Sequence, residues 1–293
     1  MSEFDKLLTS YQNRINSKLE SLLPSDDSIL SEAIRYSVLG GGKRLRPILV
    51  YLIGELGNAK NDSLDILAGS VEIIHCYSLI HDDLPSMDND NIRRGKDSNH
   101  IKYGEAIAIL SGDALQTLAF EVITNDLDLD SDLKVSAISL LTDACGYKGM
   151  VLGQELDITA NPINADEEFI KKMHYLKTGK LIEISLVLGL LGWERFSEDK
   201  DLIYKLGRSI GVGFQIVDDY LDEFGNENEI GKPIGSDLKN KKINILSILN
   251  EEECSKVISE NRSESLEIAE KIFDKEKDKD IFKIIDYIYQ RKM

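Results

Sequence analysis

Residues 67–90 read LAGSVEIIHCYSLIHDDLPSMDND, and this stretch decides the fold. From Leu67 to His81 the side chains are apolar almost all round the predicted helix, which is typical of a helix buried in the middle of a bundle. Outward from this stretch, apolar residues recur with the 3.6-residue period of a helix through most of the chain. The whole sequence of 293 residues contains only 5 prolines, so few helices are interrupted. The sequence therefore predicts an all-α fold.

Apolar periodicity and turn residues predict further helices at residues 29–39, 46–56, 105–124, 131–147, 167–192, 199–224 and 243–249. The highly charged tail, residues 251–293, keeps a helical apolar spacing and predicts a peripheral helical hairpin. No segment has the composition of a flexible linker. We therefore expect one domain over residues 1–293, a bundle of long helices around a deep central cavity.

Charge and cysteine content narrow the partners and the compartment. The formal net charge is −17, which repels nucleic acid phosphates and anionic lipids, so neither is an expected partner. The 3 cysteines are widely spaced and predict a reducing compartment. The N-terminus shows no apolar leader, and the apolar segment 181–193 is short and carries Glu183, so no membrane span is expected. These features predict a cytoplasmic protein.

Two clusters of aspartates follow strongly apolar runs. In the first, Asp82 and Asp88 are separated by Pro85, which cannot continue a regular helix, so we expect a bend that returns Asp88 towards Asp82. In the second, Asp218 and Asp222 lie four residues apart, on one face of a helix. One Asp-Asp pair alone is typical of caps and turns, but two clusters embedded in apolar sequence need cations to stay ionised. Hard oxygen ligands in this pattern predict Mg²⁺ bound together with substrate phosphates.

A chain with this negative charge needs local positive charge to bind a phosphate. Four basic segments supply it: GGKRLRP at residues 41–47, the pair Arg93-Arg94, KTGK at residues 177–180, and GKPIGSD at residues 231–237 with Lys242 beyond it. The first segment lacks the glycine spacing and the GK[ST] ending of a P-loop, which excludes kinase and NTPase interpretations there. His75, about two turns before Asp82, can donate a hydrogen bond to phosphate, although an isolated buried histidine is more often a core residue.

Taken together, these motifs resemble the trans-isoprenyl diphosphate synthase family, and most closely its bacterial farnesyl diphosphate synthases. The resemblance runs from about residue 29 to residue 249 and also includes GQELD at residues 153–157 and GVGFQIVDDYLD at residues 211–222. It implies the isoprenoid synthase fold, usually as a homodimer. It also implies Mg²⁺ as the cofactor, about three ions, for which Mn²⁺ can substitute.

Carried over position by position, the resemblance implies three sets of site residues. Asp82, Asp88 and Asp218 would bind Mg²⁺, supported by Asp83, Asp219 and Asp222. Arg93, Lys177, Thr178, Gln215 and Lys232 would line the allylic site, with Lys177 also in a catalytic role. Lys43, Arg46, His75 and Arg94 would hold isopentenyl diphosphate. Lys242 matches the last lysine of the family and joins the substrate site, whereas Asn244 stands where the family usually has Thr.

The implied reaction condenses isopentenyl diphosphate head-to-tail with dimethylallyl and then geranyl diphosphate, giving (2E,6E)-farnesyl diphosphate. Metal ions and basic side chains assist the loss of the allylic diphosphate, and an apolar cavity protects the resulting cation from water. A geranylgeranyl diphosphate synthase, with a twenty-carbon product, is the main alternative. A metal-dependent phosphohydrolase would leave GGKRLRP and the second aspartate cluster unexplained, and a non-catalytic subunit would normally have lost one of the clusters.

Product length is expected to depend on the helix before the first aspartate cluster. A chain tethered by its diphosphate near Asp82 runs back towards Ser78 and Tyr77, about one helical turn or roughly 5–8 Å away. Ser78 is small, whereas the ring of Tyr77 can form a floor that stops elongation at fifteen carbons. Alternatively, Tyr77 is only a packing residue.

Overall fold

The computed structural model describes residues 2–57, 59–161, 165–191, 193, 196–225 and 243–290. Its contacts divide the chain into two compact units, Met1–Ser139 and Leu140–Met293. Both units are built of helices, and within the described residues the only strands form one short hairpin in the first unit. The predicted all-α fold class is confirmed. The single-domain organisation stays a prediction.

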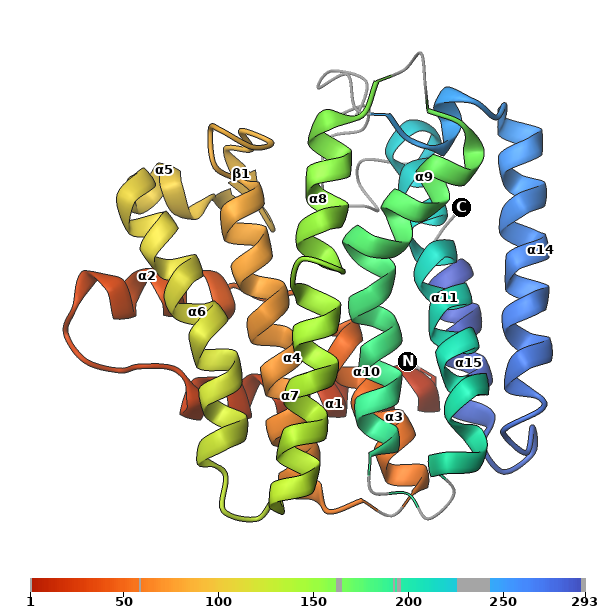
Figure 1. Cartoon of the computed structure of the whole chain (residues 1–293), viewed down its shortest axis with the longest axis horizontal. Helices are drawn as coiled ribbons and strands as arrows, with labels where there is room; N and C mark the ends of the chain where they lie inside the picture. The colour runs from red at the N-terminus through yellow and green to blue at the C-terminus, as the bar shows by residue number, and fades with distance from the viewer. Residues whose placement is uncertain are drawn as a thin grey trace. The chain divides into compact units, whose positions relative to one another are not determined.

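The helices and strands of the first unit follow in chain order (Figure 1). They are α1 (Glu3–Leu22), α2 (Ile29–Val38), α3 (Leu45–Leu56), α4 (Asn61–Asp82), β1 (Ile92–Arg93), β2 (Lys96–Asp97), α5 (Asn99–Tyr103) and α6 (Glu105–Asn125), and α7 (Ser131–Cys145) crosses the boundary between the units. Ser2 begins α1 with a reciprocal cap. Its hydroxyl accepts from the backbone amide of Asp5, and the Asp5 carboxylate accepts from the backbone amide of Ser2.

Helix α4 is the core of the first unit. Ile73 and Ile74 are fully buried on it, which confirms the predicted buried helix over residues 67–81, although the helix begins earlier, at Asn61. Helix α6 packs against α4, and at Gly112 a side chain would overlap the ring of His81. The small residue therefore permits the close approach of the two helices.

The second unit contains α8 (Met150–Thr159), α9 (Glu167–His174), a π-helical turn η1 (Tyr175–Gly179), α10 (Lys180–Leu190), α11 (Phe196–Phe224), a 3₁₀ turn η2 (Ile245–Ser247), α14 (Glu251–Ala269) and α15 (Lys279–Tyr289). All side chains of α10 from Leu181 onward are buried, as expected for the short apolar segment. The carboxyl group of Glu183 accepts a hydrogen bond from the Tyr175 hydroxyl at 2.8 Å, and burial raises its pKa.

The tail folds as a helical hairpin that packs against α11, as predicted (Figure 1). Asn250 and Glu253 form a capping box that begins α14. The hydroxyl of Tyr289 on α15 donates to Asn261 on α14 at 2.7 Å and lies 2.9 Å from the hydroxyl of Ser265. These buried polar contacts join the two helices of the tail.

Two predicted helices differ from the structure. The predicted helix over residues 167–192 is divided by the π-helical turn η1, and the predicted helix over residues 243–249 is only the 3₁₀ turn η2. In the second case, Asn244 caps the turn through its contacts with Ser247, and Asn250 begins the next helix, so the segment has no room for a full helix.

Two helices, α4 and α6, are long and apolar enough by length and composition to cross a membrane. The apolar window of α4 is 72% buried within the protein, as in the core helix of a globular fold. The corresponding window of α6 is 39% buried, and Ile109 and Leu110 are exposed on it. The prediction that the chain has no membrane span is therefore not decided by helix length.

Candidate active site

The first aspartate cluster lies at the C-terminal end of α4. The helix ends at Asp82, and the chain turns through Leu84, whose carbonyl accepts from the amide of Met87 at 2.9 Å. The amide of Asp88 then donates to the carbonyl of Asp82 at 2.9 Å. The bend predicted from Pro85 is confirmed, because this hydrogen bond brings the backbone of Asp88 next to that of Asp82.

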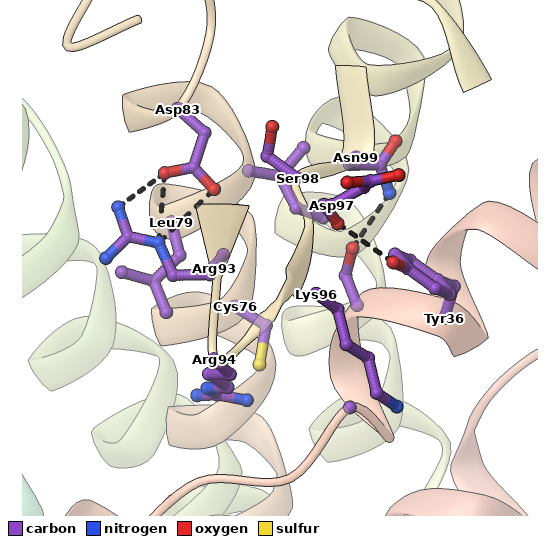
Figure 2. A pocket seen from close by; sticks show the side chains of 13 residues that line it. Tyr36, Cys76, Leu79, Asp83, Arg93, Arg94, Lys96, Asp97, Ser98 and Asn99 are labelled. Atoms are coloured by element: carbon purple, nitrogen blue, oxygen red, sulfur yellow. Dashed lines mark hydrogen bonds and ion pairs between the residues drawn. The ribbon is translucent and has the colours of Figure 1, made fainter. Parts of the chain in front are cut away.

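The two neighbouring aspartates of this cluster have different environments. Asp82 is half-buried, whereas Asp83 is buried and pairs with Arg93 on β1, with the Arg93 Nε 3.0 Å from Asp83 Oδ1 (Figure 2). Burial raises the pKa of Asp83, and the nearby guanidinium of Arg93 opposes this shift. Arg93 also lies 3.3 Å from the carboxylate of Asp90. Asp83 therefore anchors the β-hairpin and leaves Asp82 as the accessible carboxylate of the pair.

A buried ion pair lies beneath the basic segment GGKRLRP. Arg44 Nη1 is 2.6 Å from Glu72 Oε1, and both side chains are 1% exposed. The remaining donors of Arg44 bind Asn16 at 2.9 Å and the carbonyl of Val38 at 2.6 Å. Arg44 also takes the left-handed backbone conformation, with φ of 53°, immediately before α3. Arg44 is thus a structural residue of this segment.

Two further arginines of the first unit, Arg46 and Arg94, lie close enough to His75 for their charges to act on it. Arg46 is buried, which lowers its pKa to about 10, so it stays cationic at neutral pH. Burial, followed by the charges of Arg46 and Arg94, lowers the pKa of His75 well below its usual value. His75 is therefore neutral and can donate one ring N–H. Arg94 donates to the carbonyl of Gly41.

The glycine loop before α3 allows this arrangement. Gly42 has φ of 128°, and a side chain there would overlap the guanidinium of Arg94. Lys43 beside it is exposed, and its backbone carbonyl accepts from the side-chain Nε2 of Gln12 at 3.1 Å. The first unit therefore brings Arg46, His75 and Arg94 together, with Lys43 on the adjoining loop.

Arg44→Met is expected to lower the free energy of unfolding by about 3–5 kcal/mol, because it leaves the carboxylate of Glu72 buried without its closest cation. Denaturant unfolding of the purified variant measures this loss. Arg262→Met is the matched control, since Arg262 pairs with Asp286 at 2.6 Å with side chains 33% and 39% exposed. The control is expected to lose at most about 1 kcal/mol. Equal losses in both variants would show that the Arg44 pair has no special structural role.

The second aspartate cluster, on α11, repeats the pattern of the first. Asp218 is half-buried, whereas Asp219 and Asp222 are buried. Asp219 accepts from the amide nitrogen of Gln215 at 2.9 Å and from the backbone amide of Ile245 at 3.1 Å. In both clusters, therefore, the first aspartate of the pair is partly exposed and the second is buried.

The π-helical turn η1 carries Lys177 and Thr178. Lys177 Nζ lies 2.5 Å from Asp157 on α8, and the hydroxyl of Thr178 donates to the Gln215 side chain at 2.9 Å. Helix α8 approaches the turn closely, since a side chain at Gly153 would overlap the backbone of Lys177. Single π-helical turns inside helices are frequent at functional sites.

The expected product-length residues lie one turn before Asp82. Tyr77 is 5% exposed, and its ring packs edge-to-face with His81 at 5.9 Å between centroids. Ser78 is half-buried, and its hydroxyl donates to the carbonyl of His75 at 3.0 Å. The role of Tyr77 as a floor stays a prediction.

A comparison with known proteins decides the family. The model of the family described as polyprenyl synthetase matches residues 27–288, a range that includes both aspartate clusters. The chain belongs to the polyprenyl synthetase family.

Individual members of the family give the same result. The chain is 41% identical over 243 residues to the farnesyl diphosphate synthase of Haemophilus influenzae, covering 81% of this chain and 82% of that protein. It is 39% identical over 240 residues to the chloroplastic geranylgeranyl pyrophosphate synthase 7 of Arabidopsis thaliana, covering 80% of this chain and 69% of that protein. A geranyltransferase structure from Helicobacter pylori, complexed with magnesium and isoprenyl diphosphate, has a TM-score of 0.85 and 31% identity, covering 98% of this chain and 97% of that one.

The family is generally Mg²⁺-dependent, and the structure of this chain fits such a cofactor. Asp82 and Asp88 are joined through their backbones, and both are half-buried rather than closed inside the protein. Among the described residues, no three His, Cys, Asp or Glu side chains gather into a metal site made by protein alone. This donor set suits an ion that completes its coordination with substrate phosphate, as Mg²⁺ usually does.

The structure places most of the predicted site residues in two groups. The first unit contains Lys43, Arg46, His75, Tyr77, Ser78, Asp82, Asp88, Arg93 and Arg94, and the second contains Lys177, Thr178, Gln215 and Asp218. Lys232 and Lys242 lie outside the described residues. Asn244, in place of the usual Thr, caps η2, and both residue types are good N-caps.

Three polar contacts of the site were not predicted. They involve Glu72, Asp157 and His174, which bind Arg44, Lys177 and Asp219 respectively. Asp157 belongs to the GQELD motif, which is part of the family resemblance, so the sequence did indicate this residue. Glu72 and His174 stand singly in the sequence, and only the fold shows their partners.

Proposed function

We propose that the chain is a farnesyl diphosphate synthase. It condenses isopentenyl diphosphate with dimethylallyl diphosphate and then with geranyl diphosphate, and it releases one diphosphate in each round. The observation that carries the proposal is the repeated Asp-Asp arrangement, in which Asp82 and Asp218 are partly exposed while Asp83 and Asp219 are buried. The similarity to farnesyl diphosphate synthases over most of the chain supports it.

In this proposal, Asp82, Asp88 and Asp218 hold the ions that bind the allylic diphosphate. When bound, Mg²⁺ neutralises the charge that develops on the leaving diphosphate; about three ions are expected, and Mn²⁺ can replace them. Arg93, Lys177 and Lys232 are proposed to supply positive charge to the allylic diphosphate. Since Lys177 and Asp157 are 2.5 Å apart, the ammonium group is held in one position before substrate arrives.

Isopentenyl diphosphate is proposed to bind at the basic cluster of the first unit. Arg46 and Arg94 supply cationic donors, Lys43 reaches from the loop, and neutral His75 donates one hydrogen bond. Burial lowers the pKa of Arg46 to about 10, and an anion bound beside it would offset this effect by favouring the charged form of the guanidinium. The cluster thus attracts a diphosphate that the chain as a whole, with its net charge of −17, would repel.

The chemical step breaks the carbon–oxygen bond of the allylic substrate and forms a carbon–carbon bond to the double bond of isopentenyl diphosphate. The condensed cation then loses a proton. Thr178 and Gln215 present polar groups at η1 and α11 for the allylic side. The released diphosphate is the proposed proton acceptor, because the motifs contain no side chain that looks like a dedicated general base.

Separate effects on the two substrates are expected from single substitutions. Arg46→Ala or Lys43→Ala should raise the KM for isopentenyl diphosphate by about tenfold or more, because each removes a charged phosphate contact. Lys177→Ala should act on the allylic substrate instead. Steady-state kinetics with each substrate varied in turn measures both effects, and exposed Lys172 on α9 provides the control variant Lys172→Ala. If all three site variants changed both substrates equally, the assignment of the basic residues would be wrong.

The geranylgeranyl diphosphate synthase alternative is retained because relatives with that name match at 39% identity. Burial of the Tyr77 ring one turn before Asp82 favours the shorter product. A phosphohydrolase would release diphosphate or phosphate without consuming isopentenyl diphosphate. The experiment that separates a prenyl diphosphate synthase from a phosphohydrolase therefore follows isopentenyl consumption and diphosphate release in one reaction. Equal molar amounts support condensation, and release without consumption would contradict it.

A homodimer and a cytoplasmic location complete the proposal. Ile109 and Leu110 expose apolar surface on α6, 44% and 51% respectively, and Ile101 on α5 is 47% exposed. Exposed large apolar side chains of this kind are available for contact with a second copy of the chain, which supports the homodimer proposal. The three cysteines Cys76, Cys145 and Cys254 are free and buried, as expected in a reducing compartment.

A further inference from the structure

A row of two side-chain hydrogen bonds and one close polar contact connects the proposed catalytic turn to a buried histidine. The hydroxyl of Thr178 donates to Gln215 Oε1 at 2.9 Å, and Gln215 Nε2 donates to Asp219 Oδ1 at 2.9 Å. The other oxygen of Asp219 lies 3.3 Å from His174 Nε2 and 3.1 Å from the backbone amide of Ile245. All of these residues belong to the second unit.

The chemistry of each member gives the row a direction. An ionised Asp219 only accepts hydrogen bonds, so the amide nitrogen of Gln215 must face it and the amide oxygen must face Thr178. The hydroxyl hydrogen of Thr178 is then directed to Gln215, and its lone pairs are directed elsewhere. Asp219 therefore determines which face of the Thr178 hydroxyl is available to a substrate.

His174 is placed to hold Asp219 in this role. It is the last residue of α9, immediately before η1, and its side chain is 5% exposed. Burial lowers its pKa to about 4, so the ring is neutral and one nitrogen carries hydrogen. The 3.3 Å contact between Nε2 and a carboxylate oxygen favours the tautomer with that hydrogen on Nε2, and Nδ1 has no hydrogen-bond partner among the residues that the structure describes.

Other charged groups also face this histidine. Asp157 and Asp218 favour its charged form, and Lys177 opposes it. His174 thus contacts the carboxylate that orients Gln215 and is close enough to Asp157, which pairs with Lys177, for that charge to act on it. A histidine kept only for packing would not need a polar contact to the same aspartate that orients a substrate-side amide.

We propose that His174 and Asp219 are positioning residues, which orient the Thr178 hydroxyl through Gln215 towards the allylic substrate. The proposal rests on the proposed prenyltransferase function. It predicts that His174 acts on the rate of the chemical step and leaves the binding of isopentenyl diphosphate unchanged, since the basic cluster of the first unit contains neither residue.

A double-mutant cycle on the full-length protein tests the proposal. We expect His174→Met and Thr178→Val each to lower kcat by about 10- to 100-fold, an effect typical of lost orientation, with the KM for isopentenyl diphosphate changed less than about twofold. The double variant should be no slower than the slower single variant, because both changes break one row of contacts. His174→Gln, which can donate from Nε2, should restore most of the rate.

Independent effects would overturn the proposal. If the double variant lost the product of the two single losses, or if His174→Met kept the wild-type kcat, His174 would not act through Thr178. His100→Met, at another buried histidine in the first unit, is the control for packing loss. If His174→Met fails to fold, the same cycle with Asp219→Asn in its place tests the proposal. An asparagine there can donate as well as accept, so the side-chain amide of Gln215 is no longer held in one orientation. A wild-type enzyme that consumed no isopentenyl diphosphate would instead contradict the proposed function, and this outcome is distinct from failure of the positioning proposal because it appears in the unaltered protein.

Discussion

Asp82→Ala and Asp218→Ala are each expected to lower the rate of condensation by several orders of magnitude, about 10³-fold or more. The reason is that loss of an allylic diphosphate requires its developing charge to be neutralised, and each variant removes an accessible carboxylate that would hold the metal ion for this purpose. Initial rates at saturating substrates and saturating Mg²⁺ measure the effect.

The controls for this prediction lie on the same two helices. Asp62 on α4 and Asp201 on α11 are exposed, so Asp62→Ala and Asp201→Ala remove one charge each without touching the clusters. Both control variants should keep nearly the full rate. The assignment of the metal-binding residues would be contradicted if the unaltered enzyme kept its full rate in excess chelator. Equal losses of rate in the control and site variants would also contradict it.

Tyr77→Ala is expected to change the main product from fifteen carbons to twenty or more while turnover continues. The ring is 5% exposed and packs on His81, one helical turn before the end of α4. Removing it opens space where the tail of a chain tethered at Asp82 would end, and Ser78 beside it is already small. Chromatography of the dephosphorylated products gives the length distribution.

Tyr77→Phe is the matched control, because it keeps the ring and removes only the hydroxyl. It should still give mainly the fifteen-carbon product if the ring is the floor. An active Tyr77→Ala enzyme with an unchanged product distribution would place the floor elsewhere and would support the interpretation of Tyr77 as a packing residue.

The structure agrees with the sequence where one residue has a strong local effect or a long segment repeats one pattern. Pro85 cannot continue a helix, and this alone predicted the return of Asp88 to Asp82. The continuous apolar surface of residues 67–81 predicted the buried core helix α4. Both features follow from properties of the segment itself.

Features that depend on partners distant in the sequence were not predictable. The π-helical turn η1 leaves the apolar periodicity of residues 167–192 almost unchanged, and the close approach of Gly153 to Lys177 is visible only in the folded chain. The sequence also groups Arg44 with its basic neighbours, although its donors are used by Glu72, Asn16 and Val38. Both Arg44 and Arg46 are buried, so the partners that the Arg44 donors meet in the fold identify it as structural.

The short elements were missed for a different reason. The hairpin of β1 and β2 has two residues in each strand, too few for an alternating pattern to show. Its position is set by the pairing of Arg93 with buried Asp83, a contact between residues ten positions apart in the sequence. Such a contact cannot be read from strand propensity.

The most direct test of the central claim is product analysis with dimethylallyl diphosphate, excess isopentenyl diphosphate and Mg²⁺ supplied to the purified enzyme. The account predicts that farnesyl diphosphate is the main product, with two isopentenyl units consumed and two diphosphates released for each product molecule. Diphosphate release without any prenyl product, or a main product of twenty carbons from the unaltered enzyme, would contradict it.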